Sequence, residues 1–280
     1  MRIAAFADEI NRQSMERALQ LAELWDVPAV EIRSLSDGRF PRVSDAELRE
    51  VGRIIADAGR IVSGVSPGLF KCSVDHPDTE TGITELLPRA CQWAREWHTQ
   101  RISVFAFHRG EAPHGTGEYP QQVVDTLGRM CDIATASGCQ LVLENEAVCW
   151  GDTGTEAAML IDAVGSDRLS LCWDPGNAAR AGVQDTVGEY STLAHLVSHV
   201  HLKNFDPGND EWSLMDTGSV DWPEQFRALA ADGYTGYLVI ETHTSAESTV
   251  ASPSDAAGAP FSRLEANSLH NLRYTRALLG

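Results

Sequence analysis

Short apolar runs alternate with amphipathic stretches along the whole chain. The runs predict eight strands, over residues 3–7, 29–33, 61–65, 102–108, 140–144, 169–174, 199–203 and 237–241. Each run has the length of a buried strand, and the stretches between the runs have helical periodicity. Strands that alternate with helices indicate right-handed βαβ units in a parallel sheet. Eight such units are what a closed barrel needs, so we expect one α/β domain over residues 1–280, a (β/α)₈ TIM barrel.

Helix start and stop signals support the same division. In three places a Ser, Thr or Asp is followed three residues later by Glu, which is a capping-box pattern. Gly138 and Gly233 stand where helices should end. An open, doubly wound sheet is the alternative, but the first strand leads into AFADEI and not into a glycine-rich turn. The three capping patterns are Ser44–Glu47, Thr153–Glu156 and Asp221–Glu224.

One segment near the end of the chain differs in composition from the rest. Residues 245–262 follow the last predicted strand and are rich in Ala, Ser and Pro. This composition is typical of a flexible loop. The alternative is a lid over the end of the barrel where the strands reach their carboxyl termini.

Charge and cysteine usage limit the classes of partner. The chain has 22 Lys and Arg against 40 Asp and Glu, a net charge of −18. Such a surface repels phosphate backbones, so we expect no nucleic-acid partner.

The six cysteines are scattered without a CxxC pair, which favours reduced thiols and a cytoplasmic location. The apolar run at the N-terminus is too short for a signal peptide, and no segment reaches the length of a membrane span, so we expect no membrane partner.

Four consecutive predicted strands end in a side chain that can bind a metal ion. The segments LVLEN, LCWDPGN, HVHLKN and LVIETH contain Glu144, Asp174, His201 and Glu241. Neighbouring parallel strands lie about 4.8 Å apart, so these side chains can converge at one end of the barrel. Active sites of barrel enzymes are found at this end.

The alternation of side chains along a strand gives a separate test of this cluster. On the sixth strand Cys172 and Asp174 share a face opposite Leu171 and Trp173, and the other three strands show the same phase. Polar residues that simply cap strand ends are the alternative explanation. Crowded carboxylates repel one another, however, and one divalent cation removes that repulsion. Three carboxylates and an imidazole suit Mn²⁺, Mg²⁺ or Co²⁺, and Zn²⁺ is also compatible.

These motifs carry a family resemblance. LVLEN, CWDPGN, HVHLKN, SLMDTGSVDW and LVIETH resemble the xylose isomerase-like barrel superfamily of sugar phosphate isomerases and epimerases, and the resemblance runs across nearly the whole chain. That superfamily includes ketose 3-epimerases, hydroxypyruvate isomerases, inosose dehydratases and endonuclease IV. The resemblance implies that Glu144, Asp174, His201 and Glu241 bind the metal. It also implies that Glu144 and Glu241 act as an acid/base pair.

The sequence departs from one common family pattern. Many relatives have a His three residues after the sixth-strand Asp, where this chain has Asn177. That His often contacts substrate in relatives, so Asn177 is a candidate substrate-binding residue. The third strand ends in Ser66, Pro67 and Gly68 without a His. Both departures argue against a nuclease-like site with several metal ions.

Three further residues are candidates for binding substrate. His108 ends the fourth strand and can contact a substrate hydroxyl, or it is a structural residue of the strand end. Lys203 faces inward and can neutralise an oxyanion or phosphate, or it binds one of the carboxylates of the cluster. Arg33 is placed to bind a carboxylate or phosphate. The structural alternative is an internal pair between Arg33 and Glu31.

A few other polar and aromatic residues lie close to the predicted strand ends. Glu146 and His243 come just after their strands, where we expect hydrogen bonds within loops. His199 lies one layer deeper than His201 and is expected to be an interior residue. Trp212 can wall a sugar pocket by stacking, or it is a buried anchor of its loop.

The combined features predict a metal-dependent isomerase or epimerase. The substrate is expected to be a keto-sugar, a sugar phosphate or a small hydroxy-carbonyl compound that reacts through an enediolate. A dehydratase of the inosose or dehydroshikimate type shares the first step and is the main alternative. An endonuclease IV-like phosphodiesterase and a sugar-binding barrel without catalysis are further alternatives. A homodimer and a homotetramer are both compatible with these features.

Overall fold

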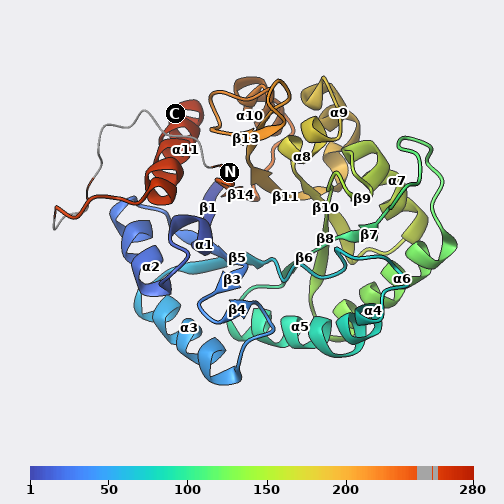
Figure 1. Ribbon diagram of the computed structural model, residues 1–280, viewed down its shortest axis with the longest axis horizontal. Coiled ribbons are helices and arrows are strands. Elements are labelled where there is room, and N and C mark those ends of the chain that lie inside the picture. The colour runs from blue at the N-terminus through green and yellow to red at the C-terminus, as the bar shows by residue number, and fades with distance from the viewer. Residues whose placement is uncertain (245–253, 255–257) are drawn as a thin grey trace.

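A closed barrel of eight parallel strands forms the centre of this computed structural model, which describes residues 1–244, 254 and 258–280. Strand β1 pairs with both β14 and β2, which closes the sheet (Figure 1). The predicted TIM-barrel fold is confirmed. In order around the barrel the strands are β1 (Arg2–Phe6), β14 (Tyr237–Ile240), β11 (Val197–Leu202), β10 (Leu169–Trp173), β8 (Gln140–Glu144), β6 (Arg101–Val104), β5 (Ile61–Val65) and β2 (Ala29–Ile32).

A ring of helices surrounds the barrel, and their apolar faces cover the outside of the sheet (Figure 1). The longer helices are α2 (Met15–Leu24), α3 (Asp45–Asp57), α5 (Leu87–Glu96), α6 (Gln121–Ala136), α7 (Gly154–Val164), α9 (Thr186–Leu193), α10 (Trp222–Ala231) and α11 (Arg263–Leu279). Shorter helical segments are α1 (Ala7–Ile10), α4 (Asp78–Thr81), η1 (Gly82–Leu86), α8 (Pro175–Arg180) and η2 (Ala194–Leu196).

The predicted helix caps are present. The Ser44 hydroxyl accepts a hydrogen bond from the Glu47 amide at 3.2 Å, which satisfies one of the free donors at the start of α3. Thr153 and Asp221 cap α7 and α10 in the same way. Local sequence therefore determines where these helices begin.

Side chains of the strands divide into two apolar layers. Val239 belongs to a small cluster inside the barrel together with Phe6 and Tyr237. Its neighbours Leu238 and Ile240 belong to the large cluster between the sheet and the helices. This division follows the alternation of side chains along β14. The polar side chains that alternate with the helix-facing residues therefore point into the barrel.

The fourth predicted strand is wrong in part. The sequence predicts one strand over residues 102–108, but β6 ends at Val104 and a separate strand β7 (Ala106–His108) follows. Strand β7 pairs antiparallel with β9 (Cys149–Trp150), outside the barrel. Phe107 has a φ of 65°, so the regular alternation breaks there. His108 lies on this outer strand, and its side chain is exposed.

Two hairpins extend the loops that follow barrel strands. The first, β3 (Ser34–Leu35) with β4 (Gly38–Arg39), follows β2. The second, β12 (Asn204–Asp206) with β13 (Glu211–Ser213), follows β11. Both start at the carboxyl ends of strands, so they stand at the end of the barrel where the polar cluster is predicted.

Two further sequence predictions concern the segment after the last strand and the absence of membrane spans. The loop predicted over residues 245–262 falls mainly outside the described ranges. Within the ranges that are described, no helix has both the length and the apolar character that crossing a membrane requires.

Candidate active site at the carboxyl end of the barrel

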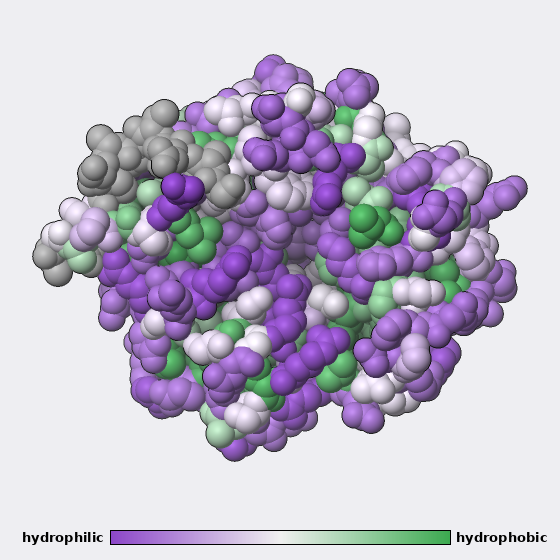
Figure 2. Space-filling view, viewed as in Figure 1, coloured by the Kyte–Doolittle hydropathy of each residue, from purple (hydrophilic) through white to green (hydrophobic). Residues whose placement is uncertain are grey.

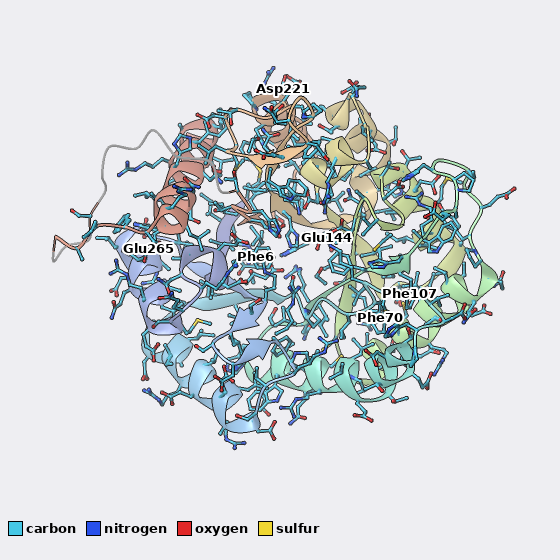
Figure 3. All side chains as sticks on the ribbon, in the orientation of Figure 1. Phe6, Phe70, Phe107, Glu144, Asp221 and Glu265 are labelled. Atoms are coloured by element: carbon cyan, nitrogen blue, oxygen red, sulfur yellow. The ribbon has the colours of Figure 1, made fainter. Side chains whose placement is uncertain are left out.

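A cavity of about 250 Å³ opens at the carboxyl end of the barrel strands. Charged side chains from four different strands line it, including Arg33 after β2, Glu144 on β8, Lys203 after β11 and Glu241 after β14. Figure 2 shows a central hollow with hydrophilic residues around it. Phe6 and Glu144 both lie beside the centre of the barrel (Figure 3). The volume is below the 300–1,000 Å³ typical of pockets for drug-sized ligands, so the cavity suits a small molecule.

The four predicted metal ligands lie together at the base of this cavity. One ligand atom from each of Glu144, Asp174, His201 and Glu241 lies within 4.8 Å of the others, and all four residues are buried. Their strands, β8, β10, β11 and β14, are consecutive around the barrel. The parallel register and the alternation of side chains thus bring together residues that are far apart in the sequence.

The backbone around Asp174 is fixed by amide groups. Asp174 is the N-cap of α8, and its Oδ1 accepts a hydrogen bond from the Asn177 amide at 2.9 Å. The side chain of Asn145 holds the Asp174 backbone on both sides: Oδ1 accepts from the Asp174 amide and Nδ2 donates to the Asp174 carbonyl, each at 2.9 Å. These bonds leave Asp174 Oδ2 free to face Glu144 and Glu241.

The donor atoms of the cluster test whether the site fits a cation. His201 Nδ1 is buried without a hydrogen-bond partner, and it lies 3.4 Å from Glu144 Oε1 and 3.9 Å from Glu241 Oε2. Asp174 Oδ2 is also buried, and its neighbour is itself a cation, the Lys203 ammonium at 2.9 Å. Burial raises the pKa of Asp174 to about 7, against the lowering effect of the Lys203 ammonium. Buried oxygen and nitrogen donors at this spacing fit a divalent cation.

Lys203 lies among the same carboxylates. Its Nζ is 2.9 Å from Asp174 Oδ2, 3.0 Å from Glu241 Oε2 and 3.9 Å from Glu144 Oε1. Burial would lower the pKa of Lys203, but the Asp174 and Glu241 carboxylates hold it well above its usual value. Gly176 makes room for the lysine, because a Cβ at this position would lie 2.8 Å from Lys203 Cγ. Lys203 thus binds carboxylates of the cluster, which is one of the two roles that the sequence left open for it.

Arg33 lines the cavity but is engaged with acidic residues. Its guanidinium donates to Asp8 at 2.9 Å, to Glu241 at 2.7 Å and to Glu9. The internal pair with Glu31 that the sequence left open is not formed, because Glu31 contacts histidines instead. The carboxylates of α1 and β14 occupy three of the five Arg33 donors. Arg33 therefore holds Glu241 in place.

Glu31 orients the histidine of the cluster. Glu31 Oε1 lies 3.3 Å from His201 Nε2, and Glu31 Oε2 lies 2.7 Å from His199 Nε2. The Ser66 hydroxyl donates to Glu31 Oε1 at 2.7 Å. Burial raises the pKa of Glu31, but His199 and His201 lower it more, so it stays well below its usual value. An ionised Glu31 favours a proton on His201 Nε2, so Nδ1, which faces Glu144 and Glu241, is the atom that would bind a cation.

Comparison with known proteins identifies the family. A family model for xylose isomerase-like TIM barrels matches residues 19–266. The chain belongs to the xylose isomerase-like TIM barrel family. Among curated members, an inosose dehydratase of Lacticaseibacillus casei is 22% identical over 148 residues, which are 47% of this chain and 49% of that protein. The chain thus spans about half the length of this curated relative.

Solved structures of family members share the fold at low identity. The probable 3-DHS dehydratase AsbF involved in petrobactin synthesis from Bacillus anthracis aligns with a TM-score of 0.76 and 15% identity, over 99% of both chains. An L-ribulose 3-epimerase aligns with a TM-score of 0.74 and 20% identity, over 99% of this chain and 94% of the other. A Mycobacterium smegmatis family member in complex with magnesium aligns with a TM-score of 0.71 and 19% identity, over 99% and 96%. At these identities the likeness shows the fold.

We expect Glu31→Gln to weaken Mn²⁺ binding by about 10- to 100-fold, the range for residues that orient a metal ligand. The neutral amide no longer favours a proton on His201 Nε2, so less of the ligand-competent tautomer is present. Isothermal titration with Mn²⁺ measures the change. Glu50→Gln on the exposed side of α3 is the matched control, since Glu50 pairs only with Arg53. Equal Mn²⁺ affinity in the two variants would refute the orienting role of Glu31.

Two of the predicted substrate-binding residues do not line the cavity. Asn177 is fully buried in the first turn of α8, where its Nδ2 donates to the Asn145 carbonyl at 2.8 Å and to Glu144 Oε1 at 3.2 Å. Asn177 therefore contacts Glu144, a residue of the cluster, without lining the cavity itself. His108 lies outside the cavity, on the strand β7 that pairs with β9 outside the barrel. The geometry gives neither residue a direct path to a substrate.

Several cavity residues were not predicted as site residues. Glu146 and His243, which we expected to make only loop hydrogen bonds, both line the cavity. Glu146 Oε2 accepts from Lys71 Nζ at 2.5 Å, and His243 Nδ1 lies 3.1 Å from Glu241 Oε1. The phase of the strands was a usable signal, because both residues stand two positions after a predicted ligand. The sequence also gave no indication of Arg39, Lys71, Phe105 and Arg180.

Proposed function

We propose that this family member is a divalent-metal-dependent isomerase or epimerase. Its substrate would be a small hydroxy-carbonyl compound, such as a keto-sugar or sugar phosphate, that reacts through an enediolate. The observation that carries the proposal is the convergence of Glu144, Asp174, His201 and Glu241 at the base of a small polar cavity. Structural similarity to an L-ribulose 3-epimerase supports this reaction class.

Glu144, Asp174, His201 and Glu241 would hold the metal ion. Three carboxylates with one imidazole suit Mn²⁺, Mg²⁺ or Co²⁺, and Zn²⁺ is compatible with the same donors. A family member of the same fold binds magnesium. When bound, a divalent ion at this site supplies electrophilic polarisation of substrate oxygens.

Glu144 and Glu241 would exchange the substrate proton. Glu144 ends β8 and Glu241 follows β14, the two ends of the four-strand arc, so they can reach a substrate from two sides. One carboxylate takes the proton from the carbon next to the carbonyl, which gives the enediolate. The other returns a proton to the neighbouring carbon, or to the opposite face of the same carbon. The first outcome is isomerisation and the second is epimerisation.

Neighbouring residues keep the two glutamates ready for this role. Asn177 Nδ2 and the Ser103 hydroxyl donate to Glu144 at 3.2 and 3.3 Å. Arg33 donates to Glu241 at 2.7 Å. Burial raises the pKa of Glu241, but the charges of Lys203, His243 and Arg33 hold it well below its usual value. Glu241 is therefore ionised at neutral pH, as a base must be.

Aromatic side chains provide apolar walls above the carboxylates. Phe6, Phe105 and Trp212 line the cavity alongside the charged groups. Apolar walls reduce the number of water molecules that can reach the reacting carbon. They would also pack against the C–H faces of a sugar-like substrate, for which Trp212 is well suited.

A dehydratase is the second candidate function, and the position of His243 supports it. The first step is the same, but a hydroxyl group β to the carbanion must then leave with a proton. The His243 imidazole lines the cavity beside Glu241, with its side chain 42% exposed, so it is placed to donate that proton. The curated relative from L. casei is named an inosose dehydratase.

One experiment separates these reactions. The Mn²⁺-loaded protein is incubated in D₂O with a panel of ketoses, inososes and hydroxy-keto acids, and the products are followed by NMR and mass spectrometry. An isomerase or epimerase incorporates deuterium without loss of water, whereas a dehydratase releases water. The protein treated with EDTA is the control and should show neither. A metal-loaded protein that exchanges deuterium with no member of the panel would contradict the proposal.

A further inference from the structure

We propose that Arg39 and Arg180 bind an anionic group of the substrate, a carboxylate or a phosphate, at the wall of the cavity. This inference rests on the proposed function, because it names the substrate class of the same cavity. Both arginines line the cavity together with Glu144 and Glu241. They are therefore able to reach a molecule that also reaches the two glutamates.

The loop after β5 holds the Arg39 side chain in place. It ends the β3–β4 hairpin, and its Nη2 donates to the Ser66 carbonyl at 3.0 Å. The guanidinium lies against the backbone of Gly68, where a Cβ would be 2.7 Å from Nη2 and 2.9 Å from Cζ. Gly68 also has a φ of 64°, a conformation that favours glycine. The loop after β5 therefore forms a cradle for this side chain.

Arg39 has no direct carboxylate partner. No carboxylate of the described residues forms an ion pair with it, and its Nε is buried without a hydrogen-bond partner. Burial and the nearby Arg33 charge lower the pKa of Arg39 to about 10, against the more distant charges of Asp8, Glu241 and Glu144, so the group still carries its charge at neutral pH. The half-buried guanidinium thus has donors without a direct partner, which an anion bound in the cavity would supply.

Arg180 stands at the C-terminal end of α8. Its Cζ lies 5.3 Å from the centre of the Trp212 ring, within the range of a cation–π contact. Lys203 Nζ lies 4.7 Å from the same ring. Trp212 thus positions Arg180 near the charged base of the cavity. No described carboxylate forms an ion pair with Arg180 either.

The residues that line the cavity differ in charge from the chain as a whole. The chain carries 40 acidic against 22 basic residues. The cavity lining instead has five Lys and Arg residues against three Glu residues. Three of the five bases are paired with carboxylates, namely Arg33, Lys71 and Lys203. The two that remain are Arg39 and Arg180.

Anion binding is the role that guanidinium groups serve best. Arg presents planar donors that match the oxygens of carboxylates and phosphates, and such charge-assisted bonds are stronger than bonds to neutral hydroxyls. A neutral sugar would need donors and acceptors in equal measure, which two unpaired guanidinium groups do not provide.

The test compares three probes of similar length by isothermal titration: D-gluconate, D-glucitol 6-phosphate and D-glucitol. Each is titrated into the wild-type protein with and without Mn²⁺. We expect at least one anionic probe to bind about tenfold or more tightly than neutral D-glucitol, since one charge-assisted hydrogen bond contributes at least that factor. The tighter of the two anionic probes shows whether the group is a carboxylate or a phosphate.

Variants attribute the preference to the two arginines. Arg39→Met and Arg180→Met should each reduce the anion preference about tenfold and leave D-glucitol binding unchanged. Arg53→Met is the matched control, because Arg53 is exposed on α3 and pairs with Glu50 and Asp57. Arg180 is exposed, so its replacement leaves the folded barrel intact even if that of Arg39 does not.

The outcomes separate this inference from the proposed function. Equal binding of all three probes by the wild-type protein would overturn the inference, as would variants that weaken D-glucitol as much as the anions. Mn²⁺ content is measured in the same samples by equilibrium dialysis. A protein that prefers anions but does not bind Mn²⁺ contradicts the proposed function alone, whereas a protein that binds Mn²⁺ but shows no anion preference contradicts this inference alone.

Discussion

Replacing Glu144 or Glu241 by Gln is expected to slow deuterium exchange into the substrate by about 10²- to 10⁴-fold, the range for loss of a general acid or base. Glutamine keeps the size of the side chain and one acceptor oxygen, so it can still receive one of the hydrogen bonds that now reach each glutamate, such as that from Arg33 to Glu241 or from Asn177 to Glu144. It cannot carry the proton. The first-order rate of exchange, measured by NMR with saturating Mn²⁺, reports the loss.

Glu146→Gln is the matched control for these variants. Glu146 lines the same cavity, but its carboxylate is paired with Lys71 and does not belong to the four-residue cluster. We expect its exchange rate to stay within about tenfold of the wild type. The acid/base assignment fails if Glu144→Gln and Glu241→Gln both retain the wild-type rate and the wild-type content of Mn²⁺.

Arg33→Met is expected to lower the free energy of unfolding by about 3–5 kcal/mol, the usual cost of removing one partner of a buried ion pair. Arg33 is the shared partner of Asp8, Glu9 and Glu241, all of which are buried. Methionine keeps much of the volume and leaves three carboxylates without their common countercharge. Urea denaturation at pH 7 measures the change in midpoint at constant slope.

The pH dependence gives this prediction a second readout. Burial raises the pKa of Glu9, but His243 and Arg33 lower it to about 2, below the 4.5 of an unperturbed glutamate. The resulting stabilisation is present above pH 4.5 and is lost as the pH falls towards 2. The difference between the wild type and Arg33→Met should therefore shrink over that range.

Arg53→Met is the reference for the loss of an arginine. Its partners Glu50 and Asp57 are exposed, so we expect a change within about 0.5 kcal/mol. A loss of stability in Arg33→Met no larger than in Arg53→Met would contradict the role assigned to Arg33.

The barrel and the four-residue cluster could be predicted because both depend on regular geometry. Strands repeat every two residues, and parallel neighbours start and end at the same edges of the sheet. Glu144, Asp174, His201 and Glu241 could therefore be assigned to one end and one face. The observed strands β8, β10, β11 and β14 have this arrangement.

The residues that escaped prediction depend on local irregularities of the backbone. His108 lies on the short strand β7, which pairs with β9 outside the barrel, whereas the sequence predicted it at the end of a barrel strand. Arg39 reaches the cavity through a two-strand hairpin, and Arg180 through a helix of six residues. Neither element is long enough to show a hydrophobic period. Contacts across the barrel interior could not be predicted from the sequence either. Glu31 contacts His199 and His201, and their strands are not neighbours in the sheet.

The ammonium group that lies between Asp174 and Glu241 bears on how the protein matures. Small zinc-binding domains stay unfolded until their ion arrives, because the ion supplies the energy of folding. Here the polypeptide brings a positive charge to its own acidic cluster, so the newly made chain can complete its barrel first. Under the proposed function, a divalent ion would enter this cluster late, after the scaffold is complete.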